Sequence, residues 1–251
     1  MGFTAISKLD PRRWLFRELR YLALFVIGAA LVAGFVALAG EMQEGETHAF
    51  DIATLKALRV PSDPARLIGP GWLQSTANDI TALGGVTVLV MVSVLAVAFL
   101  LLRGRWRQAI FTVLATAGGA MMGHLLKGLF ARSRPDAVPH LVEVTSLSFP
   151  SGHSLNSAIV YLTLAVMIAR SFSDRRSRVF TVGVAVLLVL AIGCTRVVLG
   201  VHYPTDVLGG WTLGAAWALL VGMVASVLQK QHRIEEPSES EADAPPSHLS
   251  A

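Results

Sequence analysis

The sequence predicts an all-α, polytopic membrane protein built as a bundle of six transmembrane helices. Three observations lead to this fold class. The 251-residue chain is 53% hydrophobic and only 15% charged, a balance typical of integral membrane proteins. Six apolar stretches each approach the roughly 20 residues that a helix needs to cross a bilayer. Short polar segments separate these stretches, and several of the segments are rich in arginine.

The six apolar stretches give the predicted transmembrane helices in chain order. We place them near residues 21–40, 82–102, 109–126, 154–169, 179–194 and 207–228. The fourth and fifth are short, so they either tilt little or extend into the flanking polar residues. Gly119 with Gly123, and Gly210 with Gly214, would let neighbouring helices approach closely. Together the six helices form one membrane domain, residues 21–230.

Positive charge predicts how this bundle is oriented, because cytoplasmic loops carry an excess of Lys and Arg. Basic clusters precede the first span and follow the second, fourth and sixth spans: Lys8, Arg12, Arg13, Arg17 and Arg20; Arg103, Arg105 and Arg107; Arg170, Arg175, Arg176 and Arg178; Lys230 and Arg233. We therefore expect a multi-pass protein of the cell (inner) membrane with both termini cytoplasmic. The net charge of +4 follows from these clusters, so it does not indicate nucleic-acid binding.

The two ends of the chain are predicted to be cytoplasmic segments. Residues 1–20 precede the first span, and residues 231–251 should form a disordered tail because they are rich in Glu, Ser, Pro and Ala. The first span has a basic start and an Ala37-Leu38-Ala39 triplet, as a cleavable signal peptide does. Its apolar stretch is longer than that of a signal peptide, so we favour an uncleaved helix.

An outer loop, residues 41–81, separates the first two predicted spans. It contains Ile52, Leu55 and Leu58 at the spacing of one face of a short helix, which we expect to lie on the bilayer surface. Such a helix would serve as a structural cap, with a lid that guides lipid into a site as the alternative. The single cysteine, Cys194, has no partner for an internal disulfide.

Three polar islands between the spans combine residue types that suit phosphate binding. Lys127, Arg134 and Arg196 would supply the fixed positive donors that a phosphate ester and its transition state need. Arginine pairs with two oxygens at once through its planar fork, whereas lysine acts as a compact point charge. Ser151 and Gly152 directly precede an apolar run, where backbone N–H groups at a helix N-terminus favour an anion. We predict that these five residues bind the substrate phosphate.

Two histidines and an aspartate complete the predicted chemistry. His202 lies four residues before Asp206, and Pro204 between them suits the first position of a helix. From the first helical turn, Asp206 would accept the Nδ1–H of His202, fix its tautomer and leave Nε2 free to attack phosphorus. His153 would protonate the leaving oxygen and later activate the water that hydrolyses the phosphohistidine. His202 is thus the predicted nucleophile, and His153 the acid and base.

The polar islands resemble the signature of the type 2 phosphatidic acid phosphatases, a family that shares a fold core with vanadium haloperoxidases and bacterial acid phosphatases. The first element of the family signature is a lysine, six residues and Arg-Pro, and it is matched by Lys127 and Arg134-Pro135. The second element, Pro-Ser-Gly-His, is intact at residues 150–153. Both elements are therefore present in the family's order.

The third element of the signature is usually Ser-Arg, five residues, His, three residues and Asp. Here it runs from Arg196 through His202 to Asp206, and Thr195 replaces the serine while keeping a hydroxyl. The matched elements cover residues 127–206. The order and number of apolar segments are also similar to those of the membrane-bound branch of lipid phosphatases.

The resemblance implies a metal-independent lipid phosphatase that needs no cofactor. It implies the same roles for eight residues: phosphate binding by Lys127, Arg134, Ser151, Gly152 and Arg196, and catalysis by His202, His153 and Asp206. All three elements fall on the side opposite the basic clusters, so the active site should lie at the extracytoplasmic membrane surface. The protein would be embedded in the lipid bilayer and act on a membrane lipid phosphate.

Three other polar residues near the signature have ordinary structural interpretations. Arg132 is an extra cation inside the first element, either a solvated surface residue or a contact to a lipid head group, and we leave it out of the predicted site. His124 and Asn156 lie on apolar helices, where packed and hydrogen-bonded side chains are expected.

The sequence therefore predicts an enzyme that hydrolyses a lipid phosphate or diphosphate through a phosphohistidine. Phosphatidate, phosphatidylglycerophosphate, undecaprenyl diphosphate and a lipid A phosphate all present similar chemistry, and an outward-facing site suits the recycling of undecaprenyl diphosphate best. Two alternatives stay open. One is a phosphotransferase that passes the phosphoryl group to another lipid, and the other is a non-catalytic transporter or scaffold, which would not need to retain the nucleophile and the acid.

Overall fold

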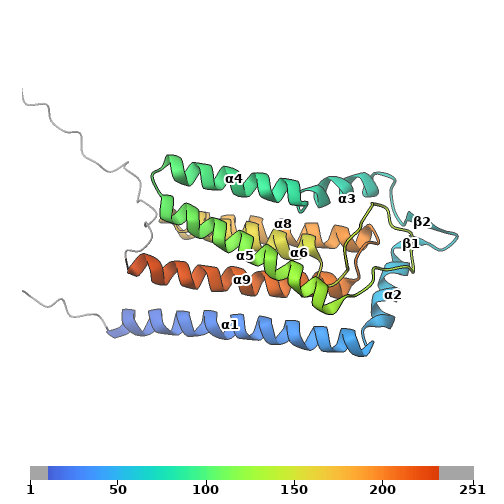
Figure 1. Cartoon of the computed structure of the whole chain (residues 1–251), viewed down its shortest axis with the longest axis horizontal. Helices are drawn as coiled ribbons and strands as arrows, with labels where there is room; N and C mark the ends of the chain where they lie inside the picture. Colours follow the sequence, from blue (N-terminus) through green and yellow to red (C-terminus); the bar gives the residue numbers. More distant parts are fainter. Residues whose placement is uncertain (1–10, 232–251) are drawn as a thin grey trace, which may run out of the picture.

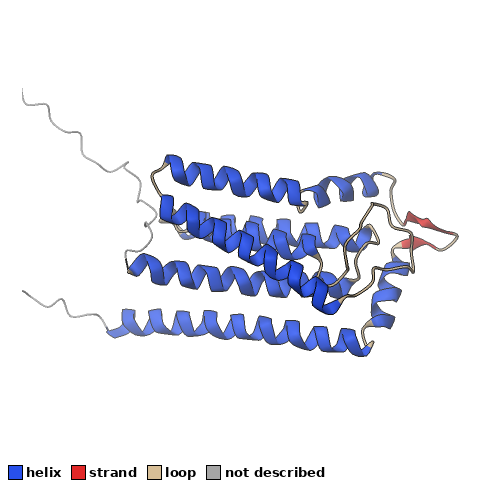
Figure 2. Ribbon diagram, viewed as in Figure 1, coloured by secondary structure: helices blue, strands red, loops and turns tan. Residues whose placement is uncertain are grey.

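Long apolar helices make up most of the structure, a computed structural model that describes residues 11–231. In chain order the elements are α1 (Pro11–Glu44), α2 (His48–Ala57), β1 (Arg59–Val60), β2 (Asp63–Leu67), α3 (Trp72–Ala82), α4 (Val86–Leu102), α5 (Trp106–Phe130), α6 (Gly152–Ser157), the π-helical turn η1 (Ala158–Leu162), α7 (Thr163–Ala169), α8 (Arg175–Val198) and α9 (Pro204–Lys230) (Figures 1 and 2). The predicted disorder of the C-terminal tail concerns residues that lie outside this range, apart from residue 231.

The predicted all-α membrane bundle is confirmed. Within residues 11–231, five helices are long and apolar enough to cross a membrane: α1, α5, α8, α9 and the continuous run of α6, η1 and α7. The sixth predicted span corresponds to α3 and α4, which pass the same test together but are bent by 42° at their junction. The second span was predicted to begin at residue 82, whereas α4 begins at Val86 because the glycine pair Gly84-Gly85 interrupts the helix.

Close contacts between helices depend on glycine at the positions that the sequence indicated. A Cβ atom on Gly210 of α9 would lie 2.8 Å from a backbone carbonyl oxygen at the start of α6, and one on Gly214 would lie 2.6 Å from the Cβ of Ala158. Gly119 and Gly123 of α5 face η1 and α6 in the same way, with contacts of 2.6 and 2.4 Å to side-chain carbons. The prediction of close helix approach is confirmed.

The outer segment, residues 45–85, packs on protein. Leu55 of α2 is fully buried in a cluster with Val138 and Tyr203, and Ile52 packs against the same cluster. The predicted helix ends at Ala57, so Leu58 lies just beyond it, and the expectation that this apolar face lies on the bilayer surface is wrong. The pairing of β1 and β2 into an antiparallel hairpin was not predicted, because Asp63-Pro64 does not have the composition of a strand.

All three polar islands lie at one end of the bundle. At this end, α2, the hairpin, the long loop of residues 131–151 and the turn between α8 and α9 meet (Figure 1). At the opposite end, α1 begins, α9 ends, and the arginine-rich turns join α4 to α5 and α7 to α8 (Figure 1). The helix order therefore separates the polar islands from the basic clusters, as an even number of spans requires. The side of the membrane that each end faces stays a prediction.

Candidate active site

Each catalytic candidate is positioned by the end of a helix. Ser151 is the N-cap of α6, and its hydroxyl oxygen accepts the backbone N–H of Ser154 at 3.5 Å, so α6 begins at Gly152, two residues before the predicted span. His153 lies in the first turn of that helix. Lys127 and Arg196 lie in the last turns of α5 and α8, where the helix dipole favours a cation.

The turn before α9 places a histidine and a carboxylate side by side. Pro204 is the first residue of α9, in agreement with the prediction that proline begins this helix. The Oδ2 atom of Asp206 accepts the backbone N–H of Tyr203 at 2.9 Å, which closes the first turn. His202 precedes this turn and is only 1% exposed, so its ring has a fixed position.

The eight predicted site residues converge on one cavity of about 480 Å³. Six of them line it: Lys127, Arg134, Gly152, His153, Arg196 and His202. Ser151 and Asp206 are fully buried, and each contacts the elements that carry the lining residues. The convergence is a property of the fold, because these residues come from four helices and two loops that are distant in the sequence.

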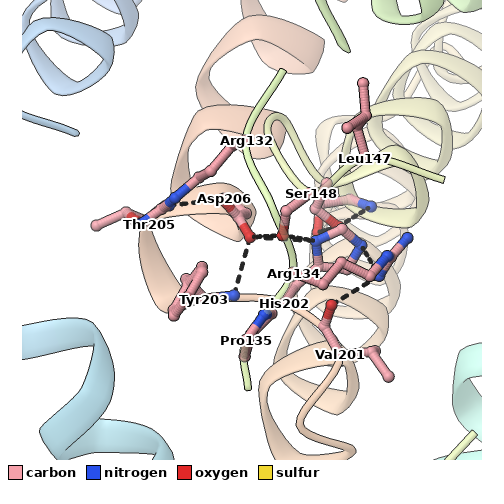
Figure 3. Close-up of polar contacts among 12 residues, drawn as sticks. Arg132, Arg134, Pro135, Leu147, Ser148, Val201, His202, Tyr203, Thr205 and Asp206 are labelled. Atoms are coloured by element: carbon pink, nitrogen blue, oxygen red, sulfur yellow. Dashed lines mark hydrogen bonds and ion pairs between the residues drawn. The ribbon is translucent and has the colours of Figure 1, made fainter. Parts of the chain in front are cut away.

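The contact between His202 and Asp206 has the geometry that the sequence predicted. The Nδ1 atom of His202 lies 3.3 Å from Oδ2 of Asp206 (Figure 3). The hydroxyl of Ser148 donates to the same carboxylate oxygen at 2.5 Å and lies 3.4 Å from Nδ1. Asp206 therefore faces Nδ1, and Nε2 points to the cavity side, 3.3 Å from Nη1 of Arg134.

The three cations are held by neutral acceptors, which leaves their charge available to an anion. Lys127 Nζ donates to the carbonyl oxygen of Leu147 at 2.5 Å, and Arg134 Nε donates to the carbonyl oxygen of Ser146 at 2.6 Å. Arg196 Nη1 donates to the hydroxyl of Thr81 at 2.9 Å, from α3. The Nε of Arg196 is buried without a hydrogen-bond partner in the described chain, so it can donate to a bound anion.

Burial sets the protonation of His202. Desolvation by burial lowers its pKa to about 4, and the neighbouring carboxylate of Asp206 opposes that shift. Arg134 and Lys127 lower the pKa of His202 further through their positive charges. The imidazole is therefore neutral at pH 7, which is the state that a nitrogen nucleophile requires.

Sequence reasoning missed the residues that surround Asp206 on its other side. Arg132 was interpreted as a solvated cation or a head-group contact, but it donates to Asp206 Oδ1 at 2.7 Å and its side chain is only 11% exposed (Figure 3). Asp51, Ser148 and Thr205 belong to the same buried network. Of these residues, only Arg132 could have been linked to the site from the sequence, because it lies two residues before Arg134.

Two other interpretations also need correction. His124 is exposed and lines the polar cavity instead of packing inside the bundle. Asn156 also lines it, and its buried Oδ1 has no hydrogen-bond partner among the described residues. Asn156, Val86 and Ala120 are shared with a second cavity of about 480 Å³, which is apolar and lies between α4, α5 and η1. The polar and apolar cavities therefore adjoin at these three residues.

Among residues 11–231, no group of three or more His, Cys, Asp or Glu side chains is arranged to hold a metal ion. Charge around the cavity is supplied instead by Lys127, Arg134 and Arg196. A metal-independent reaction stays a prediction that a chelator can test.

Comparison with known proteins identifies relatives of this chain. The sequence profile of the PAP2 superfamily matches residues 108–228, a range that contains all three polar islands. Phosphatidylglycerophosphatase B of Bacillus subtilis is 33% identical over 190 residues, which cover 74% of this chain and 89% of the relative. The crystal structure of a transmembrane PAP2 type phosphatidylglycerolphosphate phosphatase from Bacillus subtilis superposes with a TM-score of 0.72 at 31% identity and covers 80% of this chain and 96% of that one.

Other relatives act on different lipids. The decaprenylphosphoryl-5-phosphoribose phosphatase of Mycobacterium tuberculosis is 29% identical over 186 residues, which cover 70% of this chain and 94% of that protein. The lipid A 1-phosphatase of Rhizobium etli is 32% identical over 124 residues, which cover 46% of this chain and 48% of that protein. The relatives share a phosphate ester or phosphate group on a membrane lipid, but they differ in the rest of the head group.

Proposed function

The chain belongs to the PAP2 superfamily and is a multi-pass membrane lipid phosphatase, and from this premise we propose that it hydrolyses its lipid through a phosphohistidine at His202, at the extracytoplasmic membrane surface. His153 is the acid and base, and Asp206 orients His202. The phosphate is bound by Lys127, Arg134, Ser151, Gly152 and Arg196. The observation that carries the proposal is the convergence of three cations and two histidines on one cavity.

In the first step, Nε2 of His202 attacks phosphorus and the bond from phosphorus to the lipid oxygen breaks. The leaving oxygen takes a proton from His153, so a monoester releases the neutral lipid alcohol and a diphosphate releases the protonated lipid monophosphate. His202 becomes a phosphorylated imidazolium, and Asp206, 3.3 Å from Nδ1, balances its charge. Lys127, Arg134 and Arg196 neutralise the equatorial oxygens in the transition state.

In the second step, water attacks phosphorus and His153, now neutral, takes a proton from it. The bond between phosphorus and Nε2 breaks, inorganic phosphate leaves, and both histidines return to their starting states. The buried Nδ1 side of His202 holds its proton throughout, because Asp206 accepts it. No step requires a metal ion.

A lipid substrate is supported by the two adjoining cavities. The polar cavity would hold the head group, and the apolar one, lined by α4, α5 and η1, would take a hydrocarbon chain that stays at bilayer depth. Phosphatidylglycerophosphate and undecaprenyl diphosphate are the first candidates, the former because the Bacillus subtilis relative is named for it and the latter because an outward-facing site suits its recycling.

The proposal is tested by measuring phosphate release from purified protein in EDTA. The substrates are phosphatidylglycerophosphate, undecaprenyl diphosphate, phosphatidate and lipid A, each assayed with and without an acceptor lipid. We expect release from at least one lipid, complete loss in His202→Ala, and normal release in His48→Ala, which changes an exposed histidine of α2. Equal release from His202→Ala and wild type, or activity only after a metal is added, would contradict the proposal. Transfer to the acceptor in place of release would favour the phosphotransferase.

A further inference from the structure

A buried network of charges links the outer segment to Asp206. Nη1 of Arg132 donates to Asp206 Oδ1 at 2.7 Å, and Nη2 donates to Asp51 Oδ2 at 2.8 Å. Both carboxylates are fully buried, and the side chain of Arg132 is almost so. Arg132 therefore bridges two carboxylates that come from α2 and α9.

Asp51 also holds the first turn of α9. Its Oδ1 accepts the backbone N–H of Thr205 at 3.1 Å, and its Oδ2 accepts the Thr205 hydroxyl at 2.6 Å. The Thr205 hydroxyl oxygen in turn accepts a bond from Arg132 at 2.8 Å. A carboxylate at this position is stabilised by the unpaired N–H groups of a helix N-terminus. The outer segment thus fixes the turn that carries Asp206.

Arg132 is held from a third direction by an aromatic ring. Its guanidinium carbon lies 4.1 Å from the centroid of the Tyr203 ring, a cation–π contact. The backbone N–H of Tyr203 donates to Asp206 Oδ2. Asp206 is therefore bound on both oxygens, with Oδ1 toward Arg132 and Oδ2 toward His202 (Figure 3).

We propose that Asp51 and Arg132 are positioning residues of the phosphatase reaction, which hold Asp206 against His202 and set the charge beside it. This inference rests on the proposed role of His202 as the nucleophile. Two carboxylates and one guanidinium leave a single negative charge, which balances one imidazolium. Through Asp51, α2 then helps to position the catalytic Asp206.

The proposal predicts opposite pH effects for the two residues. His202 is faced by Asp206 of α9, Arg134 and Lys127 of the first island and His153 of α6, and none of these is changed. Loss of the Asp51 charge leaves Arg132 unbalanced, which disfavours protonated His202, whereas loss of the Arg132 charge favours it. The acidic limb of kcat/KM should therefore move to lower pH in Asp51→Asn and to higher pH in Arg132→Gln, each by on the order of one pH unit. The double variant should return near the wild-type limb.

The kinetic constants separate the effect of charge on His202 from the effect of the orientation of Asp206. In Arg132→Gln and in the double variant, kcat should fall about tenfold with KM unchanged, because Asp206 loses a charged hydrogen bond while the phosphate-binding residues remain. Arg132→Lys should restore the acidic limb but not kcat, because lysine does not bridge two carboxylates. Asp63→Asn and Arg66→Gln, which change exposed residues of the hairpin, are the matched controls and should change neither quantity.

A titration that needs no turnover completes the test. The chain has seven histidines, and in ¹⁵N-histidine NMR the His202 signal is the one that His202→Gln removes. The same opposite shifts in the titration of His202 would support the positioning role even if no lipid is hydrolysed. The absence of hydrolysis would contradict only the proposed function. Unshifted titrations and unshifted acidic limbs in correctly folded Asp51→Asn and Arg132→Gln would overturn the positioning role, while phosphate release by wild type would leave the proposed function standing.

Discussion

Single residues decide the charge of the active site. Arg196 reaches the cavity from α8 with a buried side chain, Thr81 fixes one of its nitrogens, and its Nε has no partner in the described chain. A buried cation with an unused donor is costly unless a ligand completes it. This arrangement supports the proposal that Arg196 binds the anionic phosphate.

The role of Arg196 predicts a large kinetic effect. Arg196→Gln should lower kcat/KM by about 10²-fold, or roughly 3 kcal/mol of transition-state stabilisation, because one fixed donor to the developing charge is lost. Steady-state phosphate release measures this. Arg103→Gln, at the opposite end of the bundle, is the matched control and should retain wild-type rates. A rate for Arg196→Gln within twofold of wild type would remove this residue from the site.

The pH profile of the wild type should be bell-shaped. His202 must be neutral, and since burial lowers its pKa to about 4, its reactive form persists above that pH and is lost as the pH falls through it. The alkaline limb is expected in kcat, because His153 must carry a proton when it meets the leaving oxygen of the bound lipid. Measurement of kcat and kcat/KM from pH 3 to 10 tests both limbs, and flat profiles would rule out this pair as nucleophile and acid.

The site was predictable from the sequence only where residue type and spacing carried the signal. Lys127, His153 and His202 occur in spaced patterns with an evident phosphate chemistry, and the fold brings them together. Asp51 lies 81 residues before Arg132, and a lone aspartate in a loop is ordinary, so nothing in the sequence linked the two. Contacts between distant buried charges depend on tertiary packing, which local patterns do not encode.

At the scale of elements, apolar length predicted the helices and glycine predicted their contacts. The helix ends differed by a few residues because α5 and α8 continue into the polar islands, so that Lys127 and Arg196 are helical. The break between α3 and α4 was not predicted. It places Gly84 where a Cβ atom would clash with Ile192 of α8 and lie 3.3 Å from the ring of His153, so glycine allows close packing there.

The packing of α9 on α6 gives a stability prediction. Gly210→Ala would put a methyl group 2.8 Å from the Ser151 carbonyl oxygen, and the resulting overpacking should cost about 1–3 kcal/mol and lower the activity by displacing the start of α6. Gly183→Ala in α8 is the control, because its Cβ would meet nothing within 4 Å. Thermal unfolding in detergent measures the difference. Equal midpoints for the two variants would show that the contact is not tight.

At the scale of the whole molecule, the arrangement of the ends predicts the topology. The polar islands and the hairpin occupy one end and the arginine-rich turns the other (Figure 1), so the positive-inside rule predicts that the active site lies outside the cytoplasm. This orientation could be predicted from the sequence because it depends only on the number of spans and on the positions of the basic residues between them. The packing of α2 could not be predicted from the sequence, because Leu55 is buried against Val138 and Tyr203, which lie far along the chain.

Cysteine labelling tests the orientation. In a Cys194→Ser background, Asp63→Cys on the hairpin should react with a membrane-impermeant maleimide in spheroplasts of a bacterial host, and Ser173→Cys in the turn between α7 and α8 should react only after lysis. Both positions are exposed in the fold, so the membrane alone separates them. The reverse labelling pattern would place the active site in the cytoplasm.

The most direct test of the account is to trap the phosphoenzyme on His202. A phosphate ester with a good leaving group needs little help from the acid, so His153→Ala should still be phosphorylated but should lack the base for hydrolysis. Rapid quenching at alkaline pH and mass spectrometry of the peptide that contains His202 would then show one phosphoryl group, absent in His202→Ala. Phosphate release that continues with no phosphoryl group on His202, or a phosphoryl group on another residue instead, would contradict the central claim.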